Sequence, residues 1–195
     1  MSSTKMASAL TFRPLTKDLW KDFENLFGQR GACGGCWCMS WRLSRAEFNA
    51  NKGERNRQAM KRVVSSGLAP GVLAFDGKQA VGWCAVAPRE QYPALGRSRI
   101  FAPIDSQEVW SISCIFIAKP YRNRGVSAQL IKAAMDLVRK QGGKIVEGYP
   151  QDLKGQKLPD AFVWTGLSPS FKRAGFHVAA RRSPKRPIMR CVIAN

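Results

Sequence analysis

The chain has 195 residues and a formal net charge of +19, since 32 lysines and arginines outnumber 13 aspartates and glutamates. Hydrophobic residues make up 45% and charged residues 23%, which excludes a disordered or fibrous chain and is typical of a globular domain. No stretch reaches the roughly 20 apolar residues of a membrane helix, and residues 1–7 lack the apolar core of a signal peptide. We therefore expect a single domain over 1–195 in the cytoplasm, with 1–9 as a disordered tail and no membrane partner.

The excess of positive charge is the most unusual property of the composition. A field of this sign attracts nucleic acid, ribosomes, anionic lipid and phosphorylated ligands. The sequence shows no helix-turn-helix, zinc-finger or RNA-recognition motif, so only a weak association with nucleic acid or ribosomes is predicted from charge. The basic residues form three clusters: Lys52, Arg55, Arg57, Lys61 and Arg62; Arg89, Arg97 and Arg99; and Arg181, Arg182, Lys185, Arg186 and Arg190.

Hydrophobic periodicity and turn residues outline the secondary structure. Asp76-Gly77 between two apolar runs predicts a hairpin, and apolar residues at helical spacing predict a long helix that ends at Gly142-Gly143. In chain order the expected elements are a strand at 11–15, a helix at 20–28, an irregular segment at 31–41, a helix from Ser44 through the basic stretch 54–64, strands at 72–75 and 80–86, a basic loop at 88–105, a strand at 109–117, a helix at 125–140, a strand at 144–149, a helix at 171–175, and strands at 177–182 and 188–193. This order indicates a mixed sheet with helices packed on it.

The loop between the apolar strand and the long helix carries the strongest functional signal. Arg122, Arg124 and Gly125 lie in this loop, and the small residues Ser127 and Ala128 begin the helix. The first N–H groups of a helix have no partner within it and lie at the positive end of its dipole, and glycine lets a ligand approach the backbone closely. The loop therefore suits a pyrophosphate, although an ordinary strand–helix turn with solvated arginines has the same pattern.

Two motifs resemble the Gcn5-related N-acetyltransferase (GNAT) superfamily. Residues 122–127, Arg-Asn-Arg-Gly-Val-Ser, are similar to its Arg/Gln-x-x-Gly-x-Gly/Ala signature, and residues 171–176 resemble its Tyr-x-x-x-Gly-Phe element. The order of elements is similar from about Leu10 to Ile193. The resemblance implies an α/β (α+β) fold: a mixed, mostly antiparallel sheet of about six to seven strands, flanked by about four helices and splayed between strands 4 and 5.

The resemblance also implies acetyl-CoA as cosubstrate. Its pyrophosphate would lie on the loop, its pantetheine arm would follow the edge of the fourth strand, and the thioester would enter near Tyr149 and Pro150. The cofactor-binding residues implied in this way are Ile115, Phe116, Ile117, Arg122, Asn123, Arg124, Gly125, Val126, Ser127 and Ala128. Two positions depart from the family pattern, because Ser127 replaces Gly or Ala and Phe171 replaces the tyrosine that protonates the leaving thiolate in many members.

The residues that would catalyse the transfer are less clearly marked. The glutamate that some family members carry on the fourth strand corresponds to Ser111, which is not a base. Glu108 and Glu147 are therefore the candidate general bases, and Tyr149 is the candidate acid. For Glu147 and Tyr149 a salt bridge and core packing are the alternative interpretations.

Six cysteines are present, and we interpret most of them as reduced thiols. Cys33, Cys36 and Cys38 have a C-x₂-C-x-C spacing, which leaves zinc binding and redox chemistry as alternatives to a structural loop over the acceptor pocket. We predict no metal, because no second spaced pair of ligands follows. Cys114 as an acyl-accepting nucleophile is an alternative, but its apolar neighbours favour a core position, and His177 is interpreted as structural.

The predicted activity is an acyl-CoA-dependent N-acetyltransferase that moves the acetyl group of acetyl-CoA to a primary amine by direct attack. We expect a small-molecule acceptor, with a peptide or protein amine as the second choice, and a monomer or homodimer. Two alternatives come from other classes: a basic RNA- or ribosome-associated binding module, and a protein that binds acyl-CoA without turnover.

Overall fold

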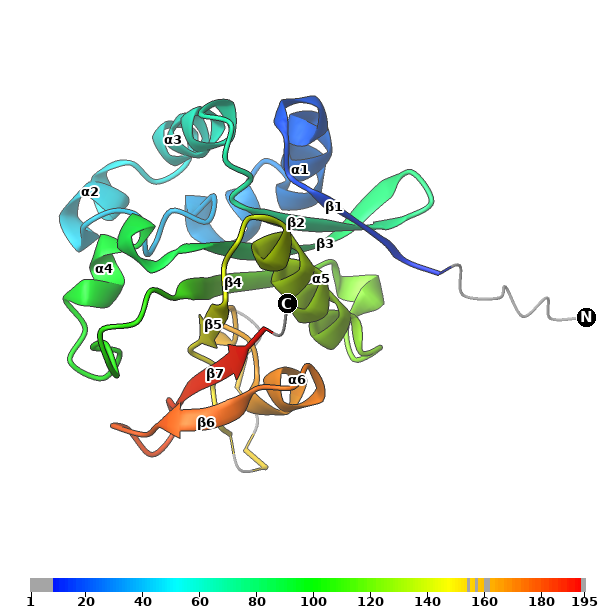
Figure 1. Ribbon diagram of the computed structural model, residues 1–195. Coiled ribbons are helices and arrows are strands. Elements are labelled where there is room, and N and C mark those ends of the chain that lie inside the picture. The colour runs from blue at the N-terminus through cyan, green and yellow to red at the C-terminus, as the bar shows by residue number, and fades with distance from the viewer. Residues whose placement is uncertain (1–8, 154, 157, 160–161, 194–195) are drawn as a thin grey trace, which may run out of the picture.

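Seven strands form one sheet in the order β1-β2-β3-β4-β5-β7-β6 (Figure 1). The structure is a computed structural model that describes residues 9–153, 155–156, 158–159 and 162–193, so the predicted tail lies outside the described residues except for Ala9. The strands are β1 (Thr11–Pro14), β2 (Gly71–Asp76), β3 (Gln79–Pro88), β4 (Trp110–Ile117), β5 (Ile145–Gly148), β6 (His177–Ala180) and β7 (Ile188–Val192). Neighbouring strands are antiparallel except for β4 and β5, which confirms the predicted mixed sheet.

Helices cover both faces of this sheet. They are α1 (Trp20–Phe27), α2 (Arg45–Ala50), α3 (Glu54–Ser65), α4 (Pro93–Gly96), α5 (Val126–Lys140) and α6 (Ser168–Arg173), with single turns η1 (Lys17–Leu19), η2 (Gly31–Gly35), η3 (Arg89–Gln91) and η4 (Lys119–Tyr121). The expected helix from Ser44 through 54–64 is two helices, because the chain turns at Gly53 with φ +85°, a left-handed conformation that favours glycine. The basic loop 88–105 contains the short helix α4.

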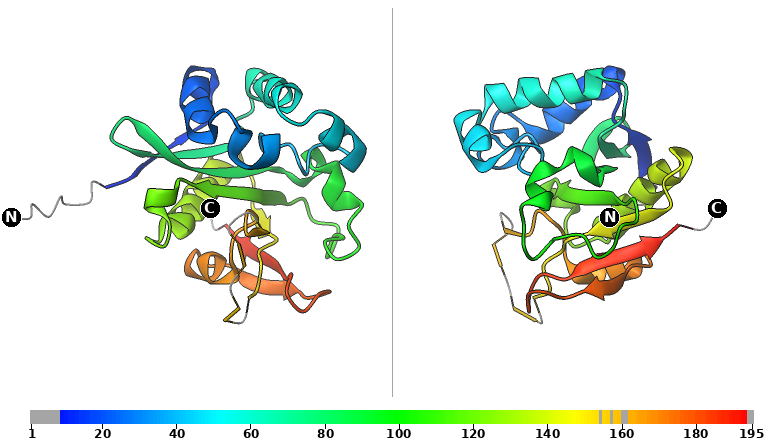
Figure 2. Two further views of the ribbon diagram at one scale, coloured as in Figure 1. Left: turned by 180° about the vertical axis from the view of Figure 1, so that it is seen from behind. Right: turned by 60° about the vertical axis from the view of Figure 1, so that its left-hand side comes forward.

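The two faces of the sheet have separate apolar cores. On one face α5 packs through Leu130, Ala134 and Leu137 against residues of the central strands. On the other face α1 and α3 cover Trp83 of β3, and Phe23 of α1 belongs to the same apolar core. The two further views show α1 and α3 together on one side of the sheet and α5 on the other (Figure 2). None of the helices in the described part of the chain has the length and apolarity that a membrane crossing requires.

The sheet opens between β4 and β5. Only Trp110 to Ile112 pair with β5, whereas β4 continues to Ile117. Pro150 follows β5 and has no N–H to donate to a ladder. The chain after β5 pairs instead with the segment before α6, since the Gln151 amide donates to Gly166 at 2.9 Å. The predicted splay between strands 4 and 5 is therefore present, and it leaves the last half of β4 without a β5 partner.

Candidate active site

A groove of about 360 Å³ runs along the open edge of β4 to the N-terminus of α5. Three parts of the chain form it: the η2 segment, the end of β4 with the following loop, and the segment that leads into α6. Its lining residues are Ala32, Cys33, Ile115, Phe116, Ile117, Arg122, Asn123, Ser127, Val163, Trp164, Gly166, Leu167 and Ser170. The fold therefore brings together side chains that lie far apart in the sequence, and we call this space the β4 groove.

The loop that enters α5 has the backbone conformation of an anion site. Asn123 and Gly125 have φ +60° and φ +76°, so two left-handed residues turn the chain abruptly into the helix. The Arg122 guanidinium folds back and donates from Nε to the Ile117 carbonyl at 2.9 Å. A Cβ placed on Gly125 would meet nothing within 4 Å. The space around Gly125 is therefore open where the loop meets the first turn of α5, although the Ala128 amide of that turn donates to the Gly125 carbonyl at 3.1 Å. A helix N-terminus that meets a groove is the kind of place where proteins bind phosphate.

The predicted CoA residues divide into two groups. Ile115, Phe116, Ile117, Arg122, Asn123 and Ser127 line the β4 groove, and Arg124, Gly125, Val126 and Ala128 do not contribute side chains to it. Val126 and Ala128 are buried and face the core, whereas Arg124 lies over the Tyr121 ring at 5.9 Å. A role for these four in binding would come from backbone amides or from charge. The binding assignments stay predictions.

The segment that closes the groove opposite β4 carries no predicted site residue. The Ile115 amide donates to the Trp164 carbonyl at 2.7 Å, so this segment occupies the first free position on the β4 edge. Ser170 of α6 is also missed, and its Oγ lies 2.7 Å from Oγ of Ser127. No periodicity or motif marks residues 151–167; only Trp164 beside Gly166, just before the Gly-Phe element, is a signal that could have drawn attention there.

A second, apolar groove of about 210 Å³ continues from the β4 groove under the η2 segment. It shares Ala32, Cys33, Ile115, Phe116 and Trp164 with the β4 groove. Its other lining residues are Phe27, Cys36, Cys38, Ser40, Trp41, Phe48 and Cys114. The Cys-rich segment therefore lies over a pocket beside the β4 groove, and its role at an acceptor pocket stays a prediction.

All six cysteines are free thiols. Among the described residues, no group of three His, Cys, Asp or Glu side chains is placed to hold a metal ion. Cys33 is exposed where the two grooves meet, and Cys38 and Cys114 are buried at the apolar groove. Cys114 belongs to the core as well as to this wall.

The candidates Tyr149 and Glu147 belong to a buried polar network beside the fork. The Tyr149 hydroxyl accepts a hydrogen bond from Arg89 Nη1 at 2.6 Å, donates to Glu147 Oε2 at 3.0 Å and lies 2.8 Å from Ser111 Oγ. Glu147 is 1% exposed and also accepts two hydrogen bonds from Arg190, at 2.8 and 3.1 Å. Burial, reinforced by the Glu147 charge, raises the pKa of Tyr149.

Neither side chain lines either groove. The third candidate, Glu108, is exposed just before β4 and is also not among the lining residues. Phe171, at the position of the family's tyrosine, is fully buried, and a Cβ on Gly148 would lie 2.1 Å from its Cε1. His177 is exposed at the start of β6. Contact with either groove therefore does not support the catalytic roles predicted for Glu108, Glu147 and Tyr149, and these roles are untested.

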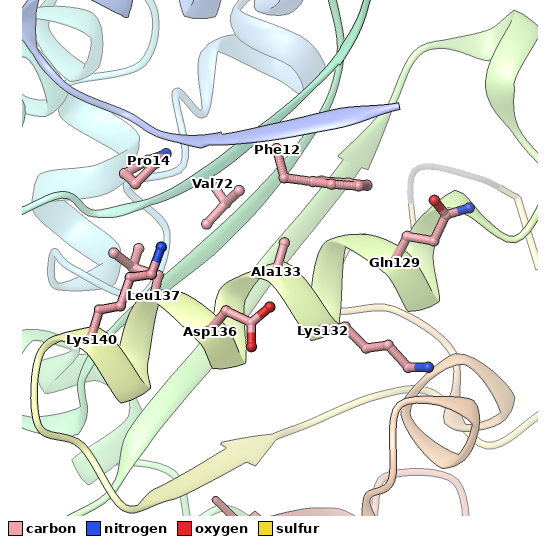
Figure 3. Close-up of a pocket in the computed structure, with 9 residues that line it drawn as sticks. All are labelled: Phe12, Pro14, Val72, Gln129, Lys132, Ala133, Asp136, Leu137 and Lys140. Atoms are coloured by element: carbon pink, nitrogen blue, oxygen red, sulfur yellow. The ribbon is translucent and has the colours of Figure 1, made fainter. Parts of the chain in front are cut away.

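A further groove, of about 350 Å³, lies between β1 and α5 (Figure 3). Phe12 and Val72 form its apolar floor, and Lys132, Asp136 and Lys140 of α5 form part of its rim. None of the predicted site residues lines it.

Comparison with known proteins agrees with the fold. The sequence profile of the Acetyltransferase (GNAT) family matches residues 37–152. A PaiA N-acetyltransferase from Thermoplasma acidophilum, crystallised with coenzyme A, superposes with a TM-score of 0.54 at 11% identity, over 95% of this chain and 99% of that one. A GNAT-family acetyltransferase from Streptococcus agalactiae gives a TM-score of 0.56 at 12% identity, over 96% and 98%. A search of curated proteins finds no match.

The matched profile defines the class of protein as an acetyltransferase. The matched profile covers more than half of the chain. The chain belongs to the GNAT acetyltransferase family, whose cosubstrate is acetyl-CoA.

Proposed function

We propose that this protein transfers the acetyl group of acetyl-CoA to a primary amine of a small-molecule acceptor. The observation that carries the proposal is the β4 groove, in which the strand edge that β5 leaves unpaired leads to the first turn of α5 at Ser127. The diphosphate of CoA would accept hydrogen bonds from the amides of that turn. The pantetheine arm would follow Phe116 and Ile117 toward the apolar groove.

The acceptor side is argued from size and charge. The apolar groove is about 210 Å³, smaller than the roughly 300–1,000 Å³ typical of a drug-sized ligand site, so it would admit a small group. The net charge of +19 disfavours acceptors with several positive charges and favours those that also carry an acid group. A small amine with a carboxylate or phosphate is the acceptor class that fits these properties best.

Transfer is tested by incubating the protein with acetyl-CoA and a library of small amines and following the acetylated products by mass spectrometry. This readout is preferable to a thiol reagent, because accessible free thiols such as the exposed Cys33 would react with that reagent. A parallel calorimetric titration with CoA separates the proposed enzyme from the alternative functions. Binding without any acetylated product would support a non-catalytic acyl-CoA-binding protein, and absence of binding would contradict the proposal.

The cytoplasmic location, the monomeric or homodimeric state and the weak association with nucleic acid stay predictions. The last of these is tested by titrating a fluorescent RNA at several salt concentrations. A purely electrostatic association would weaken steeply as salt rises.

A further inference from the structure

Three arginines lie over the rings of one small apolar cluster, which includes residues of the loop 88–105 and of β7. We call it the aromatic cluster, and its buried members are Ala87, Tyr92, Leu95, Phe101, Tyr149 and Ile188. Each of its three rings has a guanidinium above it, at 4.7, 5.8 and 4.9 Å from the guanidinium carbon to the ring centroid: Arg42 over Tyr92, Arg89 over Tyr149 and Arg186 over Phe101. These cation–π contacts gather three positive charges in one place.

Two of the three positive charges have no acidic partner among the described residues. Arg89 Nη1 lies 3.5 Å from Glu147 Oε2, whereas no ion pair of Arg42 or Arg186 is found in the described part of the chain. Both of these arginines are half-buried. Burial lowers the pKa of Arg186, but a guanidinium keeps its proton in proteins. Because a charge withdrawn from water without a counter-ion is unfavourable, the aromatic cluster is suited to an anion that a ligand supplies.

Arg186 is held beside the opening between β4 and β5. It lies in the turn between β6 and β7, and its Nη2 donates to the Tyr149 carbonyl at 3.0 Å and to Thr165 Oγ1 at 3.5 Å. The same turn is tied to the loop that follows α4 (Figure 1), because Arg182 Nη2 donates to the Pro103 carbonyl at 3.1 Å. These contacts hold the guanidinium in place before a ligand arrives, which lowers the entropic cost of binding.

Two nitrogen atoms of Arg186 have no partner among the described residues. Its Nε is buried and has no hydrogen-bond partner in the described structure. Nη1 makes no hydrogen bond to the described residues either, and it is not fully buried. A carboxylate, which is planar and carries one negative charge, matches one guanidinium that has a free nitrogen.

Aromatic contacts connect Arg186 with the apolar groove. The Phe101 ring beneath Arg186 meets the Trp41 ring edge-on, with 5.9 Å between centroids, and Trp41 lines the apolar groove. Thr165, a hydrogen-bond partner of Arg186, directly follows Trp164, which lines both grooves. Arg186 itself lines neither groove, so it lies one ring beyond the wall. It is therefore placed for the far end of an acceptor and not for the reacting amine.

Resting on the proposed function, we propose that Arg186 binds the carboxylate of the acceptor, so that the protein acetylates small amino acids in preference to neutral amines. The amine would lie in the apolar groove, and the carboxylate would accept a hydrogen bond from Nη1 of Arg186. Arg42, the second half-buried cation without an acid among the described residues, adds positive potential at the same cluster. The acceptor class narrows in this way to amines that carry a carboxylate at one particular distance from the nitrogen.

The test measures kcat/KM for a series of ω-amino acids, from glycine to aminocaproate, and for the carboxamide of each, with the acetylated products followed by mass spectrometry. At one chain length we expect the acid to exceed its carboxamide by about tenfold or more, because the carboxamide cannot form a charge-assisted hydrogen bond with Arg186. Equal values for acid and carboxamide at every chain length would overturn the inference. A phosphonate analogue that is a better acceptor than the best acid would overturn the choice of a carboxylate.

Two neighbouring positions separate recognition from folding and from overall charge. Arg186→Gln should raise KM for the preferred acid by about tenfold or more and leave its carboxamide unchanged. Lys185→Gln is the matched control, because it removes the same charge from the same turn, where the exposed Lys185 Nζ donates to Gln156 Oε1 at 2.8 Å; it should keep the wild-type preference. Arg186→Lys should retain part of the preference, since the charge remains without the planar guanidinium. An equal fall for acid and carboxamide in Arg186→Gln would indicate a merely structural role and contradict the inference.

The wild-type series gives a result even where Arg186→Gln does not fold. Protein that binds CoA but acetylates none of the acids, or prefers none of them over its carboxamide, contradicts the inference alone. Wild-type protein that fails to bind CoA in calorimetry overturns the proposed function together with it.

Discussion

Replacing Tyr149 with phenylalanine removes one oxygen atom from a fully buried network. The hydroxyl has three partners, at 2.6 Å from Arg89 Nη1, 2.8 Å from Ser111 Oγ and 3.0 Å from Glu147 Oε2. In the variant Arg89 keeps its hydrogen bond to the Phe101 carbonyl, and Glu147 keeps its hydrogen bond from Arg190. Ser111 is fully buried and loses the hydroxyl that lies beside its Oγ.

The cost in folding stability comes from Ser111, which is left without its buried partner. Leaving a buried polar group unsatisfied costs about 1–3 kcal/mol, so we expect Tyr149→Phe to lower the free energy of unfolding by about 2 kcal/mol. For a chain of this length, 1 kcal/mol corresponds to about 2–4 °C in Tm, so the melting temperature should fall by about 4–8 °C. Circular dichroism melts and urea titrations measure both quantities.

Tyr121→Phe is the matched control, because it removes the same atom from a partly exposed site with a single partner, Asp76 Oδ2 at 2.7 Å. It should cost less than about 1 kcal/mol. Turnover of Tyr149→Phe, measured below its melting range, should stay near wild type because the hydroxyl lines neither groove. A fall in kcat of about 10²-fold or more with unchanged stability would refute this reasoning and support Tyr149 as the general acid.

Two further predictions concern packing and pH. Gly148→Ala should destabilise the protein by about 1–3 kcal/mol in urea titrations, because its Cβ would lie 2.1 Å from Phe171 Cε1, whereas Gly96→Ala meets nothing within 4 Å and should be neutral. Hydrogen bonds from Arg57 lower the pKa of Glu54 from 4.5 to about 2. The contribution of ionised Glu54 to the free energy of unfolding is therefore full above pH 4.5 and is lost as the pH falls toward about 2. Acid titration of the unfolding midpoint should show that loss, and Glu54→Gln should flatten it; an unchanged pH slope would contradict the assignment.

Much of the fold follows from local sequence signals. The helical spacing of Leu130, Ala134 and Leu137 predicts α5 and its buried face, and Asp76-Gly77 predicts the β2–β3 hairpin. The capping box of Ser44 and Glu47 correctly marks the start of α2. These features depend on residues close together in the chain, so the pattern alone determines them.

The candidate site is less predictable because it depends on contacts between distant segments. The loop residues from Arg122 onward are marked by a motif, but the Trp164 carbonyl reaches the Ile115 amide only through the path of the chain around the fork. The pairing of Glu147 with Arg190 likewise follows from β5 and β7 being neighbours. No short-range pattern contains that information, since a salt bridge depends on tertiary position.

A calorimetric CoA titration of two alanine variants shows whether the first turn of α5 binds the CoA diphosphate. Gly125→Ala and Gly142→Ala lie at opposite ends of α5, with φ +76° and +80° and no atom within 4 Å of the added Cβ. Both should lose about 1–2 kcal/mol of stability. Only Gly125→Ala should weaken CoA binding, by about tenfold or more, because its added methyl group would project into the open space beside the loop where the diphosphate is proposed to lie. Equal CoA affinities for the two variants and wild type would contradict the account.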